Sequence, residues 1–233
     1  KVAYDEQGNP TKAALGFARS QGVAVETLVR QRTEEGEYVF AIIQEPTRPA
    51  PEVLAEIFPR LFGELAFPKT MRWGDGEARF ARPIRWIVAL YDGEVISTAF
   101  AGIESGRLTR GHRFVSPGPH PVRDPEDYLR VLREAYVLLD QEEREAAIRE
   151  QLARAAQEVG GRPRIDPALL QEAVFTAEWP TVLLGRFPEE FLDQPQEVLV
   201  TVMQHHQKYF PVEGPDGTLL PFFLAVRDGP ETG

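Results

Sequence analysis

Apolar residues recur at spacings of three and four along much of the chain, which is the pattern of helices that bury one face. The longest such stretch is Asp140–Val159, where Ile148 and Leu152 lie on the apolar stripe. Thr11 can cap the first helix, and Gly22 can end it. The sequence predicts helices over residues 11–21, 51–65, 140–159, 166–178 and 194–206, and a further helix that begins at Asp124.

Other stretches alternate between apolar and polar residues, or are rich in β-branched residues, as strands are. Residues 26–46 predict a hairpin centred on Glu34, Glu35 and Gly36, with a loop slightly longer than two residues. Asp92-Gly93 is a strong two-residue turn signal between an expected strand Arg79–Tyr91 and its antiparallel partner Glu94–Ala101. Further strands are expected over residues 181–187, from Lys208, and over residues 220–226.

Helices and hairpins alternate irregularly, so the predicted fold class is α+β, with antiparallel hairpins or a mixed sheet packed with helices. Proline is concentrated in Ser116–Arg123. We therefore expect two regions. Residues 1–118 would form an α+β region with a basic hairpin, and residues 119–233 a helix-rich region that closes with a β-hairpin.

Composition narrows the class of protein. The chain has 233 residues, a net charge of −10 and no cysteine, which excludes disulfides and thiolate metal sites. It has no apolar run long enough to span a membrane and no apolar signal region at its start. A cytoplasmic protein is expected. The first residue is Lys1 rather than methionine, which indicates a fragment.

One segment carries the opposite charge to the rest of the chain. Lys69–Phe114, the basic segment, has eight lysines and arginines against five acidic residues, a local balance of +3. Trp73 and Trp86 lie within it. Cations interleaved with large flat rings suit contact with phosphates and bases, although such rings are usually core residues.

The candidate RNA-binding residues follow from this charge, with Lys208 added from a second region. In an extended strand Arg79 and Arg85 would share one face and Arg82 the other. The alternative for each arginine is an ion pair with the protein's own surplus of acids. The candidates are Arg72, Arg79, Arg82, Arg85, Arg107, Arg110, His112, Arg113 and Lys208.

Gly111 and the histidines raise separate questions. Gly111 permits a close backbone approach or an unusual dihedral angle. His112 could act as an acid or base, but a hydrogen-bonded structural histidine is the stronger interpretation. Adjacent residues on a helix point about 100° apart, so we expect one of His205 and His206 to pack and the other to meet solvent. The sequence holds no phosphate-binding loop, dinucleotide fingerprint, zinc-protease motif or nucleophile elbow, and no catalytic or metal-binding residue is assigned.

Four phrases together resemble the β subunit of bacterial glycyl-tRNA synthetase, in the same order and at similar spacing. They are FPKTMRWGDGEARFARPIRWIVAL, AGIESGRLTRGHRF, AEWP and QKYFPV. The family's β subunit is much longer, so the chain is expected to be an N-terminal-region fragment. It would lack the family's HD-like region and its helical anticodon-binding region.

The resemblance implies a class II synthetase of α2β2 composition that charges tRNA(Gly) with glycine. The α subunit would hold ATP, Mg²⁺ and glycine, and the β subunit would recognise and position tRNA. The main hypothesis is therefore a noncatalytic region that positions tRNA and supports assembly. A structural scaffold or subunit-interface module without RNA contact is the second hypothesis. A hydrolytic editing domain that uses His112, or His205 and His206, is the third.

Overall fold

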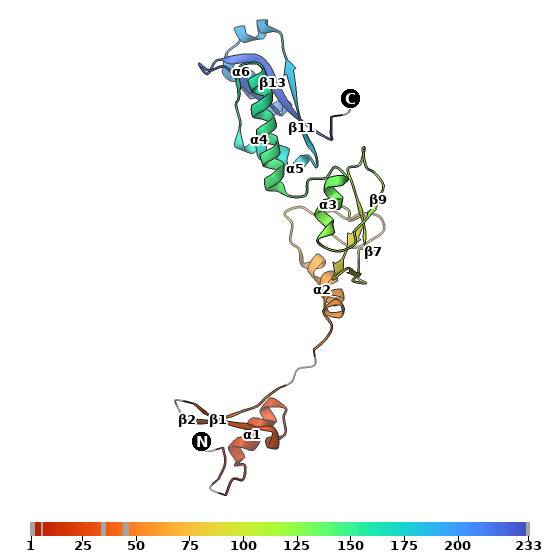
Figure 1. Cartoon of the computed structure of the whole chain (residues 1–233), viewed down its shortest axis with the longest axis vertical. Coiled ribbons are helices and arrows are strands. Elements are labelled where there is room, and N and C mark those ends of the chain that lie inside the picture. The colour runs from red at the N-terminus through yellow and green to blue at the C-terminus, as the bar shows by residue number, and fades with distance from the viewer. Residues whose placement is uncertain (1–2, 6, 34–35, 44–46, 232–233) are drawn as a thin grey trace. The chain divides into compact units, whose positions relative to one another are not determined.

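The chain divides by its internal contacts into two units, Lys1–Pro49 and Ala50–Gly233 (Figure 1). The computed structural model describes residues 3–5, 7–33, 36–43 and 47–231. The boundary expected at residue 118 falls inside the second unit. There β8 (Leu108–Arg110) pairs with β9 (Pro119–Pro121), so a cut between them would separate two bonded strands.

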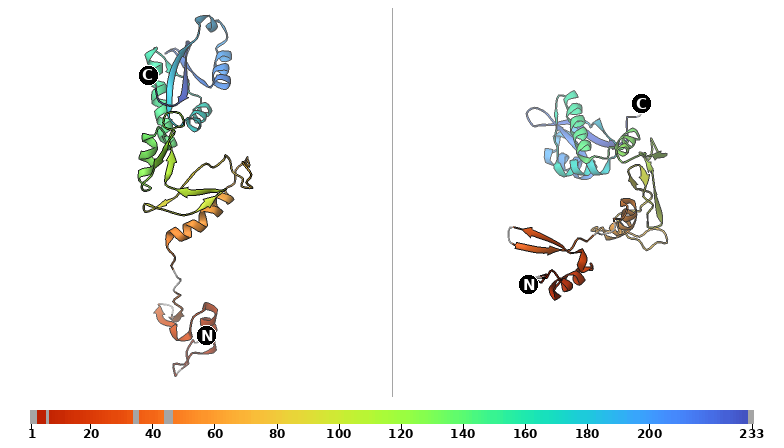
Figure 2. Two further views of the ribbon diagram at one scale, coloured as in Figure 1. Left: turned by 90° about the vertical axis from the view of Figure 1, so that its right-hand side faces the viewer. Right: turned by 60° about the horizontal axis from the view of Figure 1, so that its bottom comes forward.

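The first unit is a helix packed beside a hairpin, two elements that the sequence predicts (Figure 2). Its elements are α1 (Lys12–Gln21), the 3₁₀ turn η1 (Val25–Thr27), β1 (Val29–Thr33) and β2 (Gly36–Phe40). Thr11 accepts a hydrogen bond from the amide of Ala13, and Gly22 ends the helix in the left-handed conformation with φ 69°. Thr33 pairs with Gly36. The expected hairpin loop at Glu34 and Glu35 lies outside the described residues.

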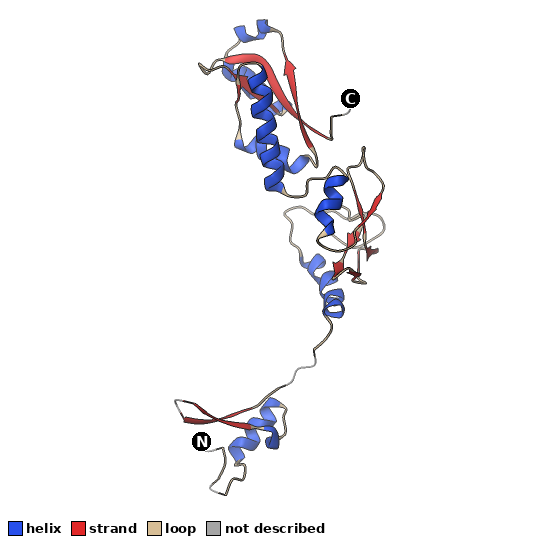
Figure 3. Cartoon of the chain, in the orientation of Figure 1, coloured by secondary structure: helices blue, strands red, loops and turns tan. Residues whose placement is uncertain are grey.

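The second unit is α+β, as expected (Figure 3). Its helical elements are α2 (Ala50–Glu64), α3 (Asp127–Glu134), α4 (Gln141–Glu158), α5 (Pro167–Thr176), η2 (Glu189–Asp193), α6 (Gln196–Thr201) and η3 (Val202–Gln207). Its strands are β3 (Ile87–Val88), β4 (Leu90–Tyr91), β5 (Glu94–Val95), β6 (Ala99–Phe100), β7 (Ile103–Gly106), β8, β9, β10 (Arg162–Pro163), β11 (Pro180–Arg186), β12 (Tyr209–Glu213) and β13 (Leu219–Asp228).

The first part of this unit is built from short strands under α2. Ile87, Ala89 and Ile96 form a small buried cluster, and apolar residues of α2 such as Leu54 and Phe58 pack against it. The helix continues through Pro59. Strand β3 lies at the edge of the sheet β3-β7-β6 and runs parallel to β7.

The long strand expected over Arg79–Tyr91 is wrong. Only β3 and β4 are strands there, and the return segment Glu94–Ala101 is likewise reduced to β5 and β6. The turn itself is confirmed, because Tyr91 pairs with Glu94 and both Asp92 and Gly93 have positive φ. The alternation that assigned Arg79, Arg82 and Arg85 to strand faces therefore does not apply.

The C-terminal part is a four-stranded antiparallel sheet of order β10-β12-β13-β11, confirming the predicted closing hairpin. Alternate residues of β13 face opposite sides. Phe222 and Leu224 pack in the main core with Ile148 of α4 and Leu170 of α5. Phe223 packs instead with the cluster formed by α6 and η3.

The predicted helices α4 and α5 are confirmed within a few residues, and the structure shows a side-chain cap at the start of each. Asp140 and Asp166 accept amide hydrogen bonds at the starts of α4 and α5. The helix expected from Asp124 begins three residues later, at Asp127. The helix expected over residues 194–206 changes into the π-helical turn η3 halfway along. Within the described ranges, no helix is both long and apolar enough to cross a membrane.

Candidate nucleic-acid interface

Three arginines of the basic segment lie in an irregular stretch before β3. Arg79, Arg82 and Arg85 are all exposed. The stretch begins near an isolated bridge between Met71 and Phe80. Between residues 47 and 231, where the structure describes the chain, no carboxylate forms an ion pair with any of the three. Their guanidinium groups are available to an external anion.

Arg72 and Arg107 are engaged within the protein. The Arg72 guanidinium lies 3.3 Å from a carboxylate oxygen of Glu77, and both side chains are exposed. Arg107 donates hydrogen bonds to the carbonyl oxygens of Val122, Arg123 and Gly93, at 3.2, 3.2 and 2.9 Å. Arg107 therefore holds β8 to the turn after β4 and to the segment after β9.

Arg110 and Arg113 are exposed but lie away from Arg85. Arg85 precedes β3, whereas Arg110 ends β8, four residues after the end of β7. Because β3 and β7 run parallel, the two sets lie toward opposite ends of these strands. Arg113 lies over the ring of Phe114, 5.3 Å from its centre. The basic segment thus carries two separate groups of exposed arginines.

Lys208 belongs to the C-terminal sheet region. It lies between η3 and β12 with φ 61°, in the left-handed region. Its ammonium group is 2.7 Å from a carboxylate oxygen of Glu172 on α5. This ion pair joins two elements of the C-terminal part, so the Lys208 ammonium group is engaged within the protein.

His112 is buried, with 1% of its surface exposed. The amide of Phe114 donates to Nδ1 at 3.4 Å. In the neutral ring the proton therefore belongs on Nε2, which lies 3.4 Å from a carboxylate oxygen of Asp228 and makes no hydrogen bond among the described residues. His112 therefore cannot contact RNA in this conformation. Its burial fits the interpretation of a structural histidine.

Asp228 connects two of the four phrases quoted in the sequence, the one that ends in RGHRF and AEWP. Its Oδ1 accepts hydrogen bonds from the amides of Glu178 and Trp179 at 2.8 and 2.9 Å, while Oδ2 faces His112. The RGHRF and AEWP phrases therefore meet at the end of β13. Sequence reasoning missed Asp228, because an aspartate before a glycine reads only as a turn signal.

His205 and His206 are both exposed, so the expectation that one of them packs is wrong. They lie in the π-helical turn η3, whose wider winding does not follow the α-helical spacing assumed from sequence. In the described part of the chain, no three His, Cys, Asp or Glu side chains cluster in a way that could hold a metal ion.

Comparison with known proteins decides the family. The family model described as "Glycyl-tRNA synthetase beta subunit" matches residues 1–233. The chain belongs to the glycyl-tRNA synthetase β-subunit family. It is 51% identical over 229 residues to the glycine–tRNA ligase β subunit of Moorella thermoacetica, and 48% identical over 227 residues to that of Geobacter metallireducens. The resemblance of its four phrases to this family is confirmed.

These alignments also define how much of a β subunit is present. They cover 98% and 97% of this chain but 33% of each relative. A third relative, from Desulforudis audaxviator, is 49% identical over 98% of the chain and again 33% of its own length. The chain spans about a third of the length of the curated relatives it matches.

Proposed function

We propose that this part of the glycyl-tRNA synthetase β subunit is a noncatalytic region that holds tRNA by its phosphate backbone. The observation that carries the proposal is the exposure of Arg79, Arg82 and Arg85 without an ionic partner among the described residues. An arginine fork matches the geometry of phosphate oxygens. Arg110 and Arg113 form a second, separate basic group that could meet the same RNA.

The acidic balance of the whole chain supports a local contact. A net charge of −10 repels a polyanion at long range. Only where cations are concentrated and unpaired does contact with a phosphate become favourable. The region would therefore position one part of tRNA(Gly) and would not coat nucleic acid without selectivity.

The chemistry of glycine charging would lie elsewhere in a class II α2β2 enzyme. An α subunit would hold ATP, Mg²⁺ and glycine, and would form glycyl-adenylate. The burial of His112 supports a noncatalytic role, because a substrate could not reach its ring without rearrangement of the surrounding loop. The same burial is an argument against His112 as the basis of a hydrolytic editing site.

Steady-state aminoacylation by the complete enzyme tests the proposal. In the full-length β subunit, Arg79→Ala, Arg82→Ala and Arg85→Ala together should raise the KM for tRNA(Gly) by about tenfold, because exposed charge contacts contribute about 0.5 kcal/mol each and tenfold corresponds to about 1.4 kcal/mol. Glycine-dependent ATP–pyrophosphate exchange without tRNA should not change. A higher KM for tRNA(Gly) with unchanged ATP–pyrophosphate exchange would show that the three arginines act in tRNA binding and not in glycine activation.

The matched control removes three exposed arginines from the C-terminal part. Arg149, Arg154 and Arg186 are exposed, and the first and third pair with Glu145 and Glu189. Their triple alanine variant makes the same change in net charge and should leave the KM for tRNA unchanged. An equal rise in both triple variants would show a general charge effect and contradict the proposal.

A scaffold role is favoured for one candidate by a specific observation. Arg107 makes all of its described hydrogen bonds to backbone carbonyl oxygens. The scaffold hypothesis therefore explains Arg107 better than RNA contact does. Arg107→Ala should lower the stability of the β3–β9 region and leave the salt dependence of tRNA binding unchanged.

A further inference from the structure

The β8–β9 loop, residues 111–118, carries an exposed aromatic ring. Phe114 is 79% exposed, the highest value for a large apolar residue in the part of the chain that the structure describes. The guanidinium of Arg113 lies over this ring, 5.3 Å from its centre, within the range of a cation–π interaction. A single exposed apolar side chain is common at a protein surface and does not by itself imply a ligand. The charge around the ring and the way its loop is held are therefore needed to assign it a role.

The β8–β9 loop is anchored on both sides of Phe114. His112 is buried, and its amide donates to the carbonyl oxygen of Ala135 at 2.9 Å. The amide of Ser116 donates to the carbonyl oxygen of His112, also at 2.9 Å, and the Ser116 hydroxyl lies 3.0 Å from Nε2 of His120. The amide of Phe114 itself donates to Nδ1 of His112. A turn held in this way loses little conformational freedom when it binds a ligand, which favours affinity.

The segment around this loop carries only positive charge. Residues 105–123 include four arginines and no aspartate or glutamate, in a chain with 36 acidic residues. Two of these arginines are bonded within the protein. The other two, Arg110 and Arg113, are exposed, and no described carboxylate forms an ion pair with either. Asp228 approaches from β13, but its Oδ2 lies against the buried ring of His112. The exposed surface of the loop therefore complements an anion.

An exposed ring beside unpaired cations fits a nucleotide better than other anions. A nucleotide offers a flat base for stacking and a phosphate for an arginine fork, whereas a lone phosphate gains nothing from the ring. Bases in a duplex are stacked on one another, so a side chain reaches the face of a base only where that base is unpaired. A protein that covered the ring would also bury the guanidinium of Arg113, and a buried charge without a partner is costly. A nucleotide avoids this cost because its phosphate supplies the opposite charge.

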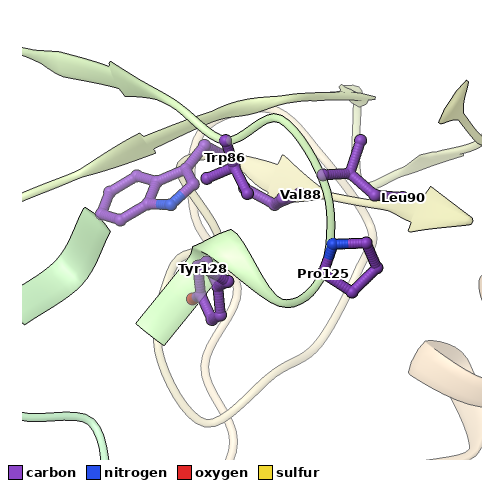
Figure 4. A pocket seen from close by; sticks show the side chains of 6 residues that line it. Trp86, Val88, Leu90, Pro125 and Tyr128 are labelled. Carbon is purple, nitrogen blue, oxygen red and sulfur yellow. The ribbon is translucent and has the colours of Figure 1, made fainter. Parts of the chain in front are cut away.

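The tryptophans of the basic segment are less suited to this role. Trp73 is half-buried. Trp86 is 42% exposed, so the expectation that it is a core residue is wrong for this chain alone, but it lines an apolar groove with Pro125 and Tyr128 (Figure 4). The hollow next to that groove is lined by three acidic residues, Asp92, Asp124 and Glu126. Their carboxylates repel phosphate, which disfavours a nucleotide there.

We propose that the β8–β9 loop is a binding site for an unpaired nucleotide of an RNA. The base stacks on the ring of Phe114, and Arg110 and Arg113 hold the adjacent phosphates. The inference rests on the proposed function, since it takes RNA as the ligand of this region. It adds to that function a contact with a base, at a place separate from the three arginines before β3.

Binding of labelled tRNA(Gly) to the complete enzyme at several salt concentrations tests the proposal. Phe114→Ala in the full-length β subunit should weaken binding by about tenfold. The slope of log K against log salt should not change in this variant, because stacking releases no counterions. Phe114→Trp should keep the affinity, since it keeps a stacking surface, whereas Phe114→Leu should lose it as the alanine variant does. Arg110→Ala and Arg113→Ala should each lower the slope by about 0.7–0.9.

The matched control is Phe175→Ala, which removes another exposed ring, 62% exposed, from α5. This variant should bind tRNA like wild type. Wild-type affinity in Phe114→Ala would overturn the proposal, and a lower melting temperature of the β subunit in the same variant would show that protein covers the ring instead. Wild-type affinity in Phe114→Leu would also overturn it, because any apolar side chain would then suffice and stacking would not be the cause.

The two proposals fail separately. Phosphate holding before β3 is judged by the arginine triple variant, and the nucleotide site is judged by Phe114→Ala and its aromatic and aliphatic counterparts. Weaker tRNA binding in Phe114→Ala, with an unchanged KM in the triple variant, would refute phosphate holding before β3 and support the nucleotide site. The reverse result would refute the nucleotide site alone.

Discussion

Gly111 lies where a helix end and a loop converge on the backbone of the RGHRF phrase. A Cβ atom at this position would lie 2.6 Å from the Cβ of Ala135 and 2.7 Å from the carbonyl oxygens of Ala135 and Ser116. The sequence left two readings of this glycine open, and the structure confirms the close approach. The amide of His112 also donates to the carbonyl oxygen of Ala135 at 2.9 Å, which fixes the contact.

Gly111→Ala should therefore lower the free energy of unfolding by about 1–3 kcal/mol, because two backbone oxygens must move to admit the methyl group. Gly118→Ala is the control, since no atom lies within 4 Å of its Cβ position. Urea unfolding followed by circular dichroism measures both. Equal stability of the two variants would mean that the backbone around Gly111 is not closely packed.

Also at the residue scale, the sequence could not distinguish the exposed arginines of the basic segment from those that are bonded within the protein. Arg82 and Arg107 look alike in a charge count, but Arg82 is exposed without a described partner while Arg107 bonds three carbonyl oxygens. The partners of Arg107 come from residues up to sixteen positions away. A local pattern carries no information about such contacts.

At the scale of elements, local signals succeeded where the determining contacts are local. The predicted helices α1, α4 and α5 are confirmed, and the structure shows that Thr11, Asp140 and Asp166 cap them by accepting amide hydrogen bonds from residues two or three positions away. The strand expected over Arg79–Tyr91 failed because β3 gains its bonds from β7, a parallel partner that follows another strand pair in the chain. Non-local pairing of this kind leaves no periodic signal in the strand itself.

The start of α3 makes a pH-dependent contribution to stability. Asp127, its first residue, is almost fully buried and accepts hydrogen bonds from the side chains of Arg130 and Arg123. The bond from Arg130 has the larger effect, and together they lower the pKa of Asp127 to about 2, from 3.8. The folded protein thus takes up a proton here less readily than the unfolded chain.

The stabilisation from Asp127 should be complete above about pH 4 and should be lost as the pH falls toward 2. Asp127→Asn should be less stable than wild type at neutral pH, and the two stability curves should converge in that acidic window. Asp193→Asn, an exposed acid with no ion pair to a described residue, is the control and should follow wild type throughout. Parallel curves for wild type and Asp127→Asn down to pH 2 would contradict the assigned cause.

At the scale of the whole molecule, charge is segregated. The chain has a net charge of −10, yet Arg79, Arg82 and Arg85 are exposed in the segment before β3, and the acidic residues Asp92, Asp124 and Glu126 line one hollow after β4. The family and the α+β class could be predicted from the sequence. The contacts of Arg107 and the role of Asp228 could not, because each depends on residues from segments that meet only in the folded chain.

The salt dependence of tRNA(Gly) binding to the complete enzyme tests the central claim most directly. Each lost phosphate contact lowers the slope of log K against log salt by about 0.7–0.9. We predict that removing Arg79, Arg82 and Arg85 together lowers the slope by about 2–3, and that removing Arg149, Arg154 and Arg186 leaves it unchanged. An unchanged slope in the first triple variant would contradict the claim that these arginines hold the tRNA backbone.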